Sequence, residues 1–142
     1  MRAALLLAAV VTAGSPFPGL AQSATPNLVD LGRSLFYGQT PTGTPARLRW
    51  EERVLPASAA RCANCHAAPK GAEPFGPRLT ADSLLTLAPR RGGPPSAYDR
   101  DSFCNAVSRG VDNTGVMLSK AMPQYPLSQP ECSAIWSFLL TQ

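Results

Sequence analysis

The chain has 142 residues, of which 44% are hydrophobic and 15% are charged, and its formal net charge is +4. This length suits one small domain with a modest core rather than a multidomain protein. Its lysines and arginines form no cluster interleaved with aromatic residues, which argues against a nucleic-acid-binding protein.

The first 21 residues have the pattern of a secretory signal peptide. A basic start, Met1-Arg2, precedes an apolar run from Ala3 to Thr12, and Gly19-Leu20-Ala21 places small residues at the expected cleavage site. An uncut membrane anchor is the alternative, although the apolar run is well short of the roughly 20 residues that span a bilayer. We therefore expect a signal peptide over residues 1–21, one domain over residues 22–142, and a periplasmic location.

The first helix of the mature chain is predicted to begin with Thr25 as N-cap and Pro26 in the first turn. Leucines at helical spacing follow, and Gly38 is a suitable C-terminal stop. Gly32 lies inside this helix, where glycine costs about 1 kcal/mol relative to alanine. Its presence predicts the close approach of another helix.

The segment from Gln39 to Ala60 loses helical periodicity and contains several prolines. Leu48, Trp50 and Val54 predict a short two-stranded excursion around Glu51-Glu52, with Trp50 covering apolar surface. Arginines are spread through this region and just beyond it: Arg47, Arg49, Arg53 and Arg61. A solvated face is the simplest interpretation of these charges, and a docking surface for an acidic partner protein is the alternative.

The next predicted helix, from Ala59 to His66, ends in the sequence Cys62-Ala63-Asn64-Cys65-His66. A C-x-x-C-H run is the attachment signature of c-type haem. Its two thiols can each add to one vinyl group of the porphyrin, and the adjacent imidazole becomes the proximal iron ligand. His66 is the single histidine of the chain, which favours haem c over a redox dithiol or a partial metal site.

Loops and three further helices are predicted after this motif. Residues 67–77 and the glycine- and proline-rich residues 90–95 are expected to be irregular. The expected helices run from Thr80 to Leu87, from Asp99 or Asp101 to Gly110, and from Ser128 onward. Ser128 and Glu131 form a capping box for the terminal helix, whose apolar residues lie on one face.

The iron needs a second axial ligand, and Met117 and Met122 are the thioethers that remain once the signal peptide is removed. Met122 precedes Pro123 in a non-helical stretch, so a stiff loop can direct its side chain towards the haem. Met117 lies among apolar residues and is more easily a core filler. We therefore predict His66 and Met122 as the iron ligands, a pair that raises the potential and suits electron transfer.

Five motifs follow one another along the chain: Gly32-x-x-Leu35-Phe36, Cys62-x-x-Cys65-His66, Gly76-Pro77-x-Leu79, Met122-Pro123-x-Tyr125, and Trp136 in the last helix. This order resembles class I monohaem cytochrome c over essentially the whole mature chain. The resemblance implies an all-α, cytochrome c-like fold in which the N- and C-terminal helices cross beside a covalently bound haem. Gly32 and Phe36 would then meet Trp136 at the crossing.

The resemblance also implies roles for residues around the haem. The carbonyl of Pro77 should accept the Nδ1 proton of His66, which fixes the imidazole and raises its basicity. An arginine, namely Arg78, Arg90 or Arg91, should meet the haem propionates. One departure from the family pattern is the long stretch between Phe36 and Cys62, which is expected to form an extra excursion near the haem-bearing helix.

Cys104 and Cys132 are the second departure, because they lie outside the attachment motif. In an oxidising periplasm, two such cysteines in a small domain are expected to pair, and two buried inert thiols are the alternative. A bridge between them would hold the loop that carries Met122 at both ends.

These observations predict a periplasmic single-electron carrier with one haem c, and not an enzyme. Expected partners are redox proteins, with a periplasmic dehydrogenase or membrane oxidoreductase as donor and an oxidase or another cytochrome as acceptor. One alternative is a cytochrome subunit bound to a single enzyme through residues 39–60. Another is a haem-based sensor or small-ligand binder in which Met122 is displaceable.

Overall fold

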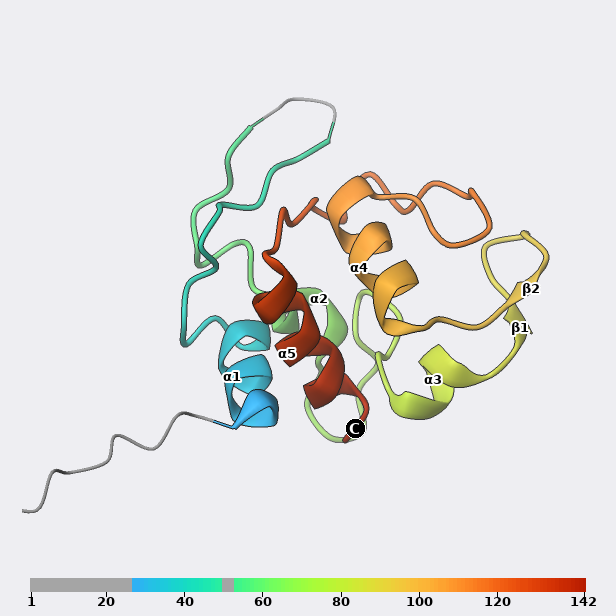
Figure 1. Cartoon of the computed structure of the whole chain (residues 1–142), viewed down its shortest axis with the longest axis horizontal. Coiled ribbons are helices and arrows are strands. Elements are labelled where there is room, and N and C mark those ends of the chain that lie inside the picture. Colours follow the sequence, from blue (N-terminus) through green and yellow to red (C-terminus); the bar gives the residue numbers. More distant parts are fainter. Residues whose placement is uncertain (1–26, 50–52) are drawn as a thin grey trace, which may run out of the picture.

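Residues 27–49 and 53–142 are described in the computed structural model of the protein (Figure 1). The predicted signal peptide, Thr25-Pro26, Trp50 and Glu51-Glu52 lie outside this range. The described helices are α1 (Leu28–Phe36), α2 (Ala63–His66), α3 (Ala81–Leu85), α4 (Arg100–Arg109) and α5 (Gln129–Leu139). The strands β1 (Ala88–Pro89) and β2 (Pro95–Ser96) pair in an antiparallel hairpin. No helix of the described residues is long and apolar enough to cross a membrane.

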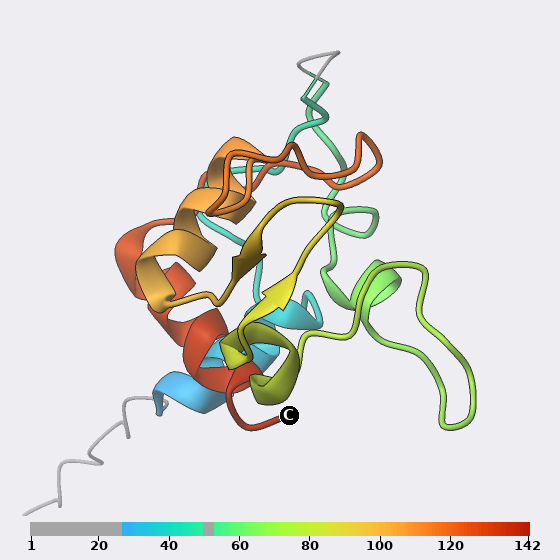
Figure 2. The same ribbon diagram turned by 90° about the vertical axis from the view of Figure 1, so that its right-hand side faces the viewer.

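The predicted all-α, cytochrome c-like fold is wrong. The described chain combines five short helices with the small β1–β2 sheet, and extended loops join most of these elements (Figure 2). Residues 90–94 form the turn of the hairpin and are irregular as expected, whereas Pro95 of the same stretch lies in β2. Prolines are rare in strands, so the sequence pattern gives no signal for the two strands. Arg91 and Gly92 reverse the chain with φ values of 47° and 77°. The Arg90 side chain then donates to the carbonyl of Ser96 across the turn, over 3.2 Å.

Close packing of α1 on α5 gives the molecule its main helix pair (Figure 1). A Cβ atom at Gly32 would collide with the backbone carbonyl of Ala134 in α5, so the predicted close approach at this glycine is confirmed. The aromatic contact differs from the expected one. Phe36 packs on Phe138 with ring centroids 5.4 Å apart, whereas Trp136 packs on Phe103 of α4 at the same distance.

One hydrophobic core joins α1, α3, α4 and α5. Its buried residues are Leu35, Phe36, Leu84, Phe103, Val107, Cys132, Ala134, Ile135, Trp136, Phe138 and Leu139. Because more than half of these residues belong to α5, this helix is the element against which the others pack.

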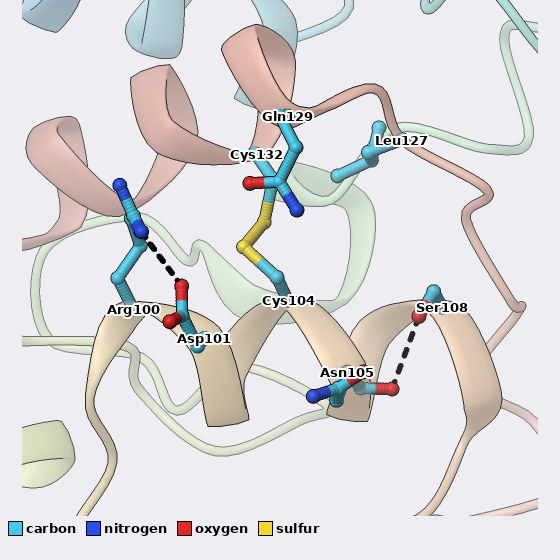
Figure 3. Close-up of a pocket in the computed structure, with 8 residues that line it drawn as sticks. All are labelled: Arg100, Asp101, Cys104, Asn105, Ser108, Leu127, Gln129 and Cys132. Atoms are coloured by element: carbon cyan, nitrogen blue, oxygen red, sulfur yellow. Dashed lines mark hydrogen bonds and ion pairs between the residues drawn. A yellow bond between two sulfur atoms is a disulfide. The ribbon is translucent and has the colours of Figure 1, made fainter.

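A disulfide between Cys104 and Cys132 ties α4 to the first turns of α5 (Figure 3). The two Cα atoms are 5.9 Å apart, within the range that disulfide geometry requires. The structure therefore pairs these cysteines as expected. The bridge encloses the whole connection from α4 to α5, which includes Met117 and Met122.

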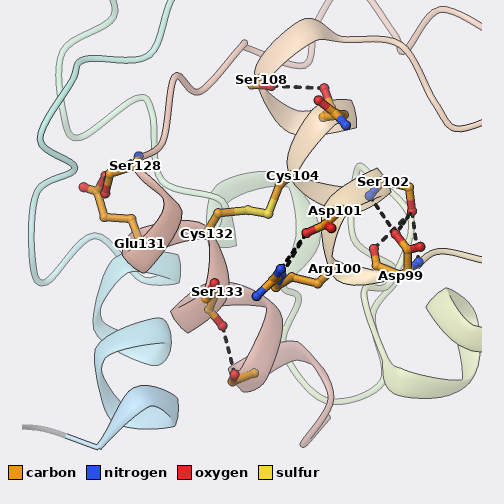
Figure 4. Close-up of a disulfide and its surroundings, with 12 residues drawn as sticks. Asp99, Arg100, Asp101, Ser102, Cys104, Ser108, Ser128, Glu131, Cys132 and Ser133 are labelled. Atoms are coloured by element: carbon orange, nitrogen blue, oxygen red, sulfur yellow. Dashed lines mark hydrogen bonds and ion pairs between the residues drawn. A yellow bond between two sulfur atoms is a disulfide. The ribbon is translucent and has the colours of Figure 1, made fainter.

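Side-chain caps begin most of the helices, and Figure 4 shows those of α4 and α5. The capping box at Ser128 is present as predicted, and the expected caps at Thr80 and at Asp99, the first of the two aspartates considered, also form capping boxes. The N-cap of α1 is Asn27, whose side chain accepts from the backbone N–H of Asp30 over 2.9 Å, and not Thr25. Asparagine is as good an N-cap as threonine, so the local pattern allowed both positions.

Candidate functional site

The C-x-x-C-H residues form a single helical turn at α2. The backbone N–H groups of Cys65 and His66 both donate to the carbonyl of Cys62, over 3.2 and 3.0 Å. Asn64 anchors this turn to the preceding segment by donating from its side chain to the carbonyl of Ser58 over 2.9 Å. Cys62 and Cys65 are half-buried and carry free thiols. Two free thiols and an imidazole are therefore held on one short, fixed turn.

The ring of His66 is oriented by the loop that follows α2. Its Nδ1 lies 2.8 Å from the carbonyl oxygen of Pro77. A carbonyl can only accept, so Nδ1 carries the proton and Nε2 of the neutral ring keeps a free lone pair. This hydrogen bond is present as the resemblance implies, while the binding of haem by His66 stays a prediction.

Gly76 lets the loop pass directly against this ring. Its backbone N–H donates to the carbonyl of Cys65 over 2.7 Å. A Cβ atom at this position would lie 2.8 Å from Cε1 and 2.9 Å from Nδ1 of His66, closer than real side chains come. The sequence predicts no separate role for Gly76, and its position directly before Pro77 is the signal that could have indicated one.

Burial sets the protonation of the groups around the thiols. Burial is the largest cause that raises the pKa of the Cys62 thiol to about 11, while a backbone hydrogen bond lowers this pKa and the nearby Cys65 adds a smaller increase. The pKa of Tyr125 is also raised above its ordinary value, first by burial and then by the proximity of Cys62 and Cys65. At neutral pH the Cys62 thiol and the Tyr125 hydroxyl are therefore uncharged.

Met122 lies at the same core as the attachment motif. Cys62, Ala63, Leu79 and Met122 are partly buried and pack against the central hydrophobic cluster. Met117 is 51% exposed, so its interpretation as a core filler is wrong. Its backbone pairs with Val111 in an isolated bridge, which is a main-chain constraint that apolar neighbours in the sequence do not reveal.

The arginines predicted to meet the propionates have partners within the protein. Arg78 donates to the carbonyl of Ala72 over 2.6 Å and lies 3.5 Å from a carboxylate oxygen of Glu73. Arg90 donates to backbone carbonyls of the hairpin region, and its guanidinium lies 5.2 Å from the centre of the Tyr98 ring. These contacts stabilise loops, and the role of Arg78, Arg90 or Arg91 towards a propionate stays a prediction.

Two surface grooves run along α4, and no residue of the attachment motif lines either of them. One is lined by the disulfide with Arg100, Asp101 and Asn105 (Figure 3), and the other lies beside Asp112. Within residues 27–49 and 53–142, no three His, Cys, Asp or Glu side chains gather where they could hold a metal ion. The grooves therefore supply no alternative metal centre in this part of the chain.

The residues around α2 fit the chemistry of haem c. A porphyrin brings four nitrogen ligands of its own, so the protein needs to supply only the axial donors and, for haem c, two thiols. The chain has groups of these kinds: the free thiols of Cys62 and Cys65, the free lone pair of His66 and, packed on the same core as Cys62, the thioether of Met122. Comparison of the chain with protein-family models, curated proteins and solved structures gives no match.

Proposed function

We propose that this protein is a periplasmic single-electron carrier with one haem c attached through Cys62 and Cys65. The observation that carries the proposal is the pairing of two free thiols with an imidazole whose Nδ1 is held 2.8 Å from the Pro77 carbonyl. A redox dithiol needs no such fixed histidine. The signal-peptide pattern of residues 1–21 supports the periplasmic location, where c-type haem proteins meet their partners.

The protein residues have separate tasks in this proposal. Each thiol would add across one vinyl group, so that sulfur bonds to carbon and the proton moves to the neighbouring carbon. His66 would bind the iron through Nε2, while its hydrogen bond to Pro77 fixes the ring and raises its basicity. Met122 would supply the second iron ligand. The bound haem supplies a one-electron iron couple, and the apolar surroundings of Cys62 and Tyr125 tune its potential.

The redox partners follow from this chemistry. A periplasmic dehydrogenase or membrane oxidoreductase would supply the electron, and an oxidase or another cytochrome would accept it. The proposed carrier makes and breaks no substrate bond, so it is not an enzyme. A haem sensor would instead bind CO at the iron of the wild-type protein, which a closed His/Met pair resists.

Covalent attachment is the first prediction. After extraction of the periplasmic protein with acid and acetone, we expect the haem colour to stay with the polypeptide, because thioether bonds survive this treatment. The Cys62→Ala variant should yield little or no holoprotein, whereas Cys104→Ala should still carry haem. Release of all the haem from wild type would overturn the proposed function.

Substitution of Gly76 is the second prediction. Gly76→Ala should destabilise the holoprotein by about 1–3 kcal/mol, because the new Cβ must displace the His66 ring or the loop. Thermal unfolding measures the effect. Gly43→Ala is the matched control, since the nearest atom to a Cβ there is 3.6 Å away. Equal melting of the two variants would show that the ring tolerates a side chain at position 76.

A further inference from the structure

The loop that carries Met122 pairs with residues 39–49 and 53–60, here called the strap. The backbone N–H of Arg47 donates to the carbonyl of Gln124 over 3.0 Å, and the N–H of Gln124 donates back to Arg47 over 2.8 Å. The strap was expected near the haem-bearing helix, and Figures 1 and 2 show that it also passes beside the chain between α4 and α5. It therefore contacts the predicted ligand loop two residues from Met122.

The strap is itself a braced structure. Its two arms pair through Arg47 and Val54, with hydrogen bonds from Leu48 to Arg53 over 3.0 Å and from Leu55 to Ala46 over 2.9 Å. The predicted two-stranded excursion is thus present as a pair of bridged arms in the described residues. A braced strap can resist displacement of the loop that it contacts.

Two further contacts join the strap to the ends of the Met122 segment. The guanidinium of Arg49 donates to the carbonyl of Gly110, the C-cap of α4, over 3.1 Å. The backbone N–H of Gly43 donates to the carboxylate of Glu131, in the first turn of α5, over 2.6 Å. Contacts at Gly110, Gln124 and Glu131 therefore hold the whole connection that bears Met122.

Gln124 is the point at which these constraints meet. Its side chain donates to the carbonyl of Arg109 over 2.6 Å, while its backbone is paired with Arg47. Only Pro123 separates it from Met122, and proline fixes φ near −65°, which limits how far the backbone of Met122 can move independently of Gln124. Displacement of the loop as a whole would strain or break the Arg47–Gln124 pair.

We infer that the strap is a clasp that positions Met122 as an iron ligand, with Arg47 acting through its backbone and Arg49 through its side chain. This inference rests on the proposed function. Both arginines are positioning residues, because they act on Met122 through Gln124 and Gly110. Opening of the loop, and hence entry of an external ligand to the iron, should be limited by these hydrogen bonds.

Cyanide binding to the ferric holoprotein tests the clasp. Arg49→Met keeps the apolar stem and removes the donor to Gly110, and we expect about tenfold tighter cyanide binding with earlier loss of the Met–iron(III) absorption band. Arg47→Met is the matched control, because it removes the same charge from an exposed side chain and keeps the backbone pair. It should stay within about twofold of wild type. Arg47→Pro removes the backbone donor and should exceed the effect of Arg49→Met.

The conservative variant Arg49→Lys separates positioning from a merely structural role. It retains a charged donor and should recover part of the wild-type resistance to cyanide. Cyanide affinity is measured well below the melting temperature of every variant. Equal cyanide affinities for Arg49→Met and Arg47→Met, in a wild type that shows the Met–iron band, would overturn the clasp alone. A wild type without covalent haem would overturn the proposed function itself.

Discussion

Replacement of Met122 by alanine is expected to remove the Met–iron coordination, lower the reduction potential and open the iron to cyanide and CO. Met122 is partly buried against the core that Cys62 and Leu79 also contact, and the proposed function makes it the second iron ligand. Thioether ligation raises haem potentials, and axial ligands as a group set them over a range of about 0.8 V. Absorption spectra of the ferric protein and a potentiometric titration measure both effects.

Met117→Ala is the matched control for this prediction. Its side chain is 51% exposed and its backbone is fixed by the bridge to Val111, so the substitution should leave the ligation and the potential unchanged. If Met117→Ala lost the Met–iron band as Met122→Ala does, the loop that carries both methionines would move as a unit. Its retention in Met122→Ala would assign the sixth ligand to another residue.

Features that depend on near neighbours in the chain could be predicted from the sequence. The caps expected at Thr80, at Asp99 or Asp101, and at Ser128 depend on residues three positions along the chain, and the structure has caps at Thr80, Asp99 and Ser128. Gly32 was correctly assigned to a close helix contact, because a mid-helix glycine is costly unless it permits such packing. The hydrogen bond from His66 to Pro77 was anticipated only through the resemblance of the motifs.

Features that depend on distant main-chain contacts could not be predicted. The β1–β2 hairpin contains prolines at Pro89 and Pro95, and its turn depends on a positive φ at Arg91, which is unusual for a residue other than glycine. The pairing of Arg47 with Gln124 uses backbone atoms alone, so no side-chain pattern announces it. Because this backbone pairing leaves no pattern in the sequence, the strap was expected to be an extra excursion and not a support for Met122.

Removal of the Cys104–Cys132 disulfide is expected to destabilise the holoprotein by roughly 3 to 4 kcal/mol. The bridge spans a sequence separation of 28 residues, and the chain-entropy account assigns an effect of this size to a loop of that length. Alanine is the better replacement, because Cys132 is 2% exposed and a serine hydroxyl would be buried there. The double Cys→Ala variant should melt about 10 °C or more below wild type.

The same variant should still fold and load haem. The contact between Phe103 and Trp136, with ring centroids 5.4 Å apart, continues to hold α4 against α5, and Cys62 and Cys65 are untouched. The loop that bears Met122 is then held by the strap without the bridge, so the Met–iron band should be lost at a lower denaturant concentration. The single variants Cys104→Ala and Cys132→Ala should each approach the double variant, because either one breaks the bridge. Unchanged melting of the double variant, or free thiols at both positions in periplasmic wild-type protein, would contradict a stabilising disulfide.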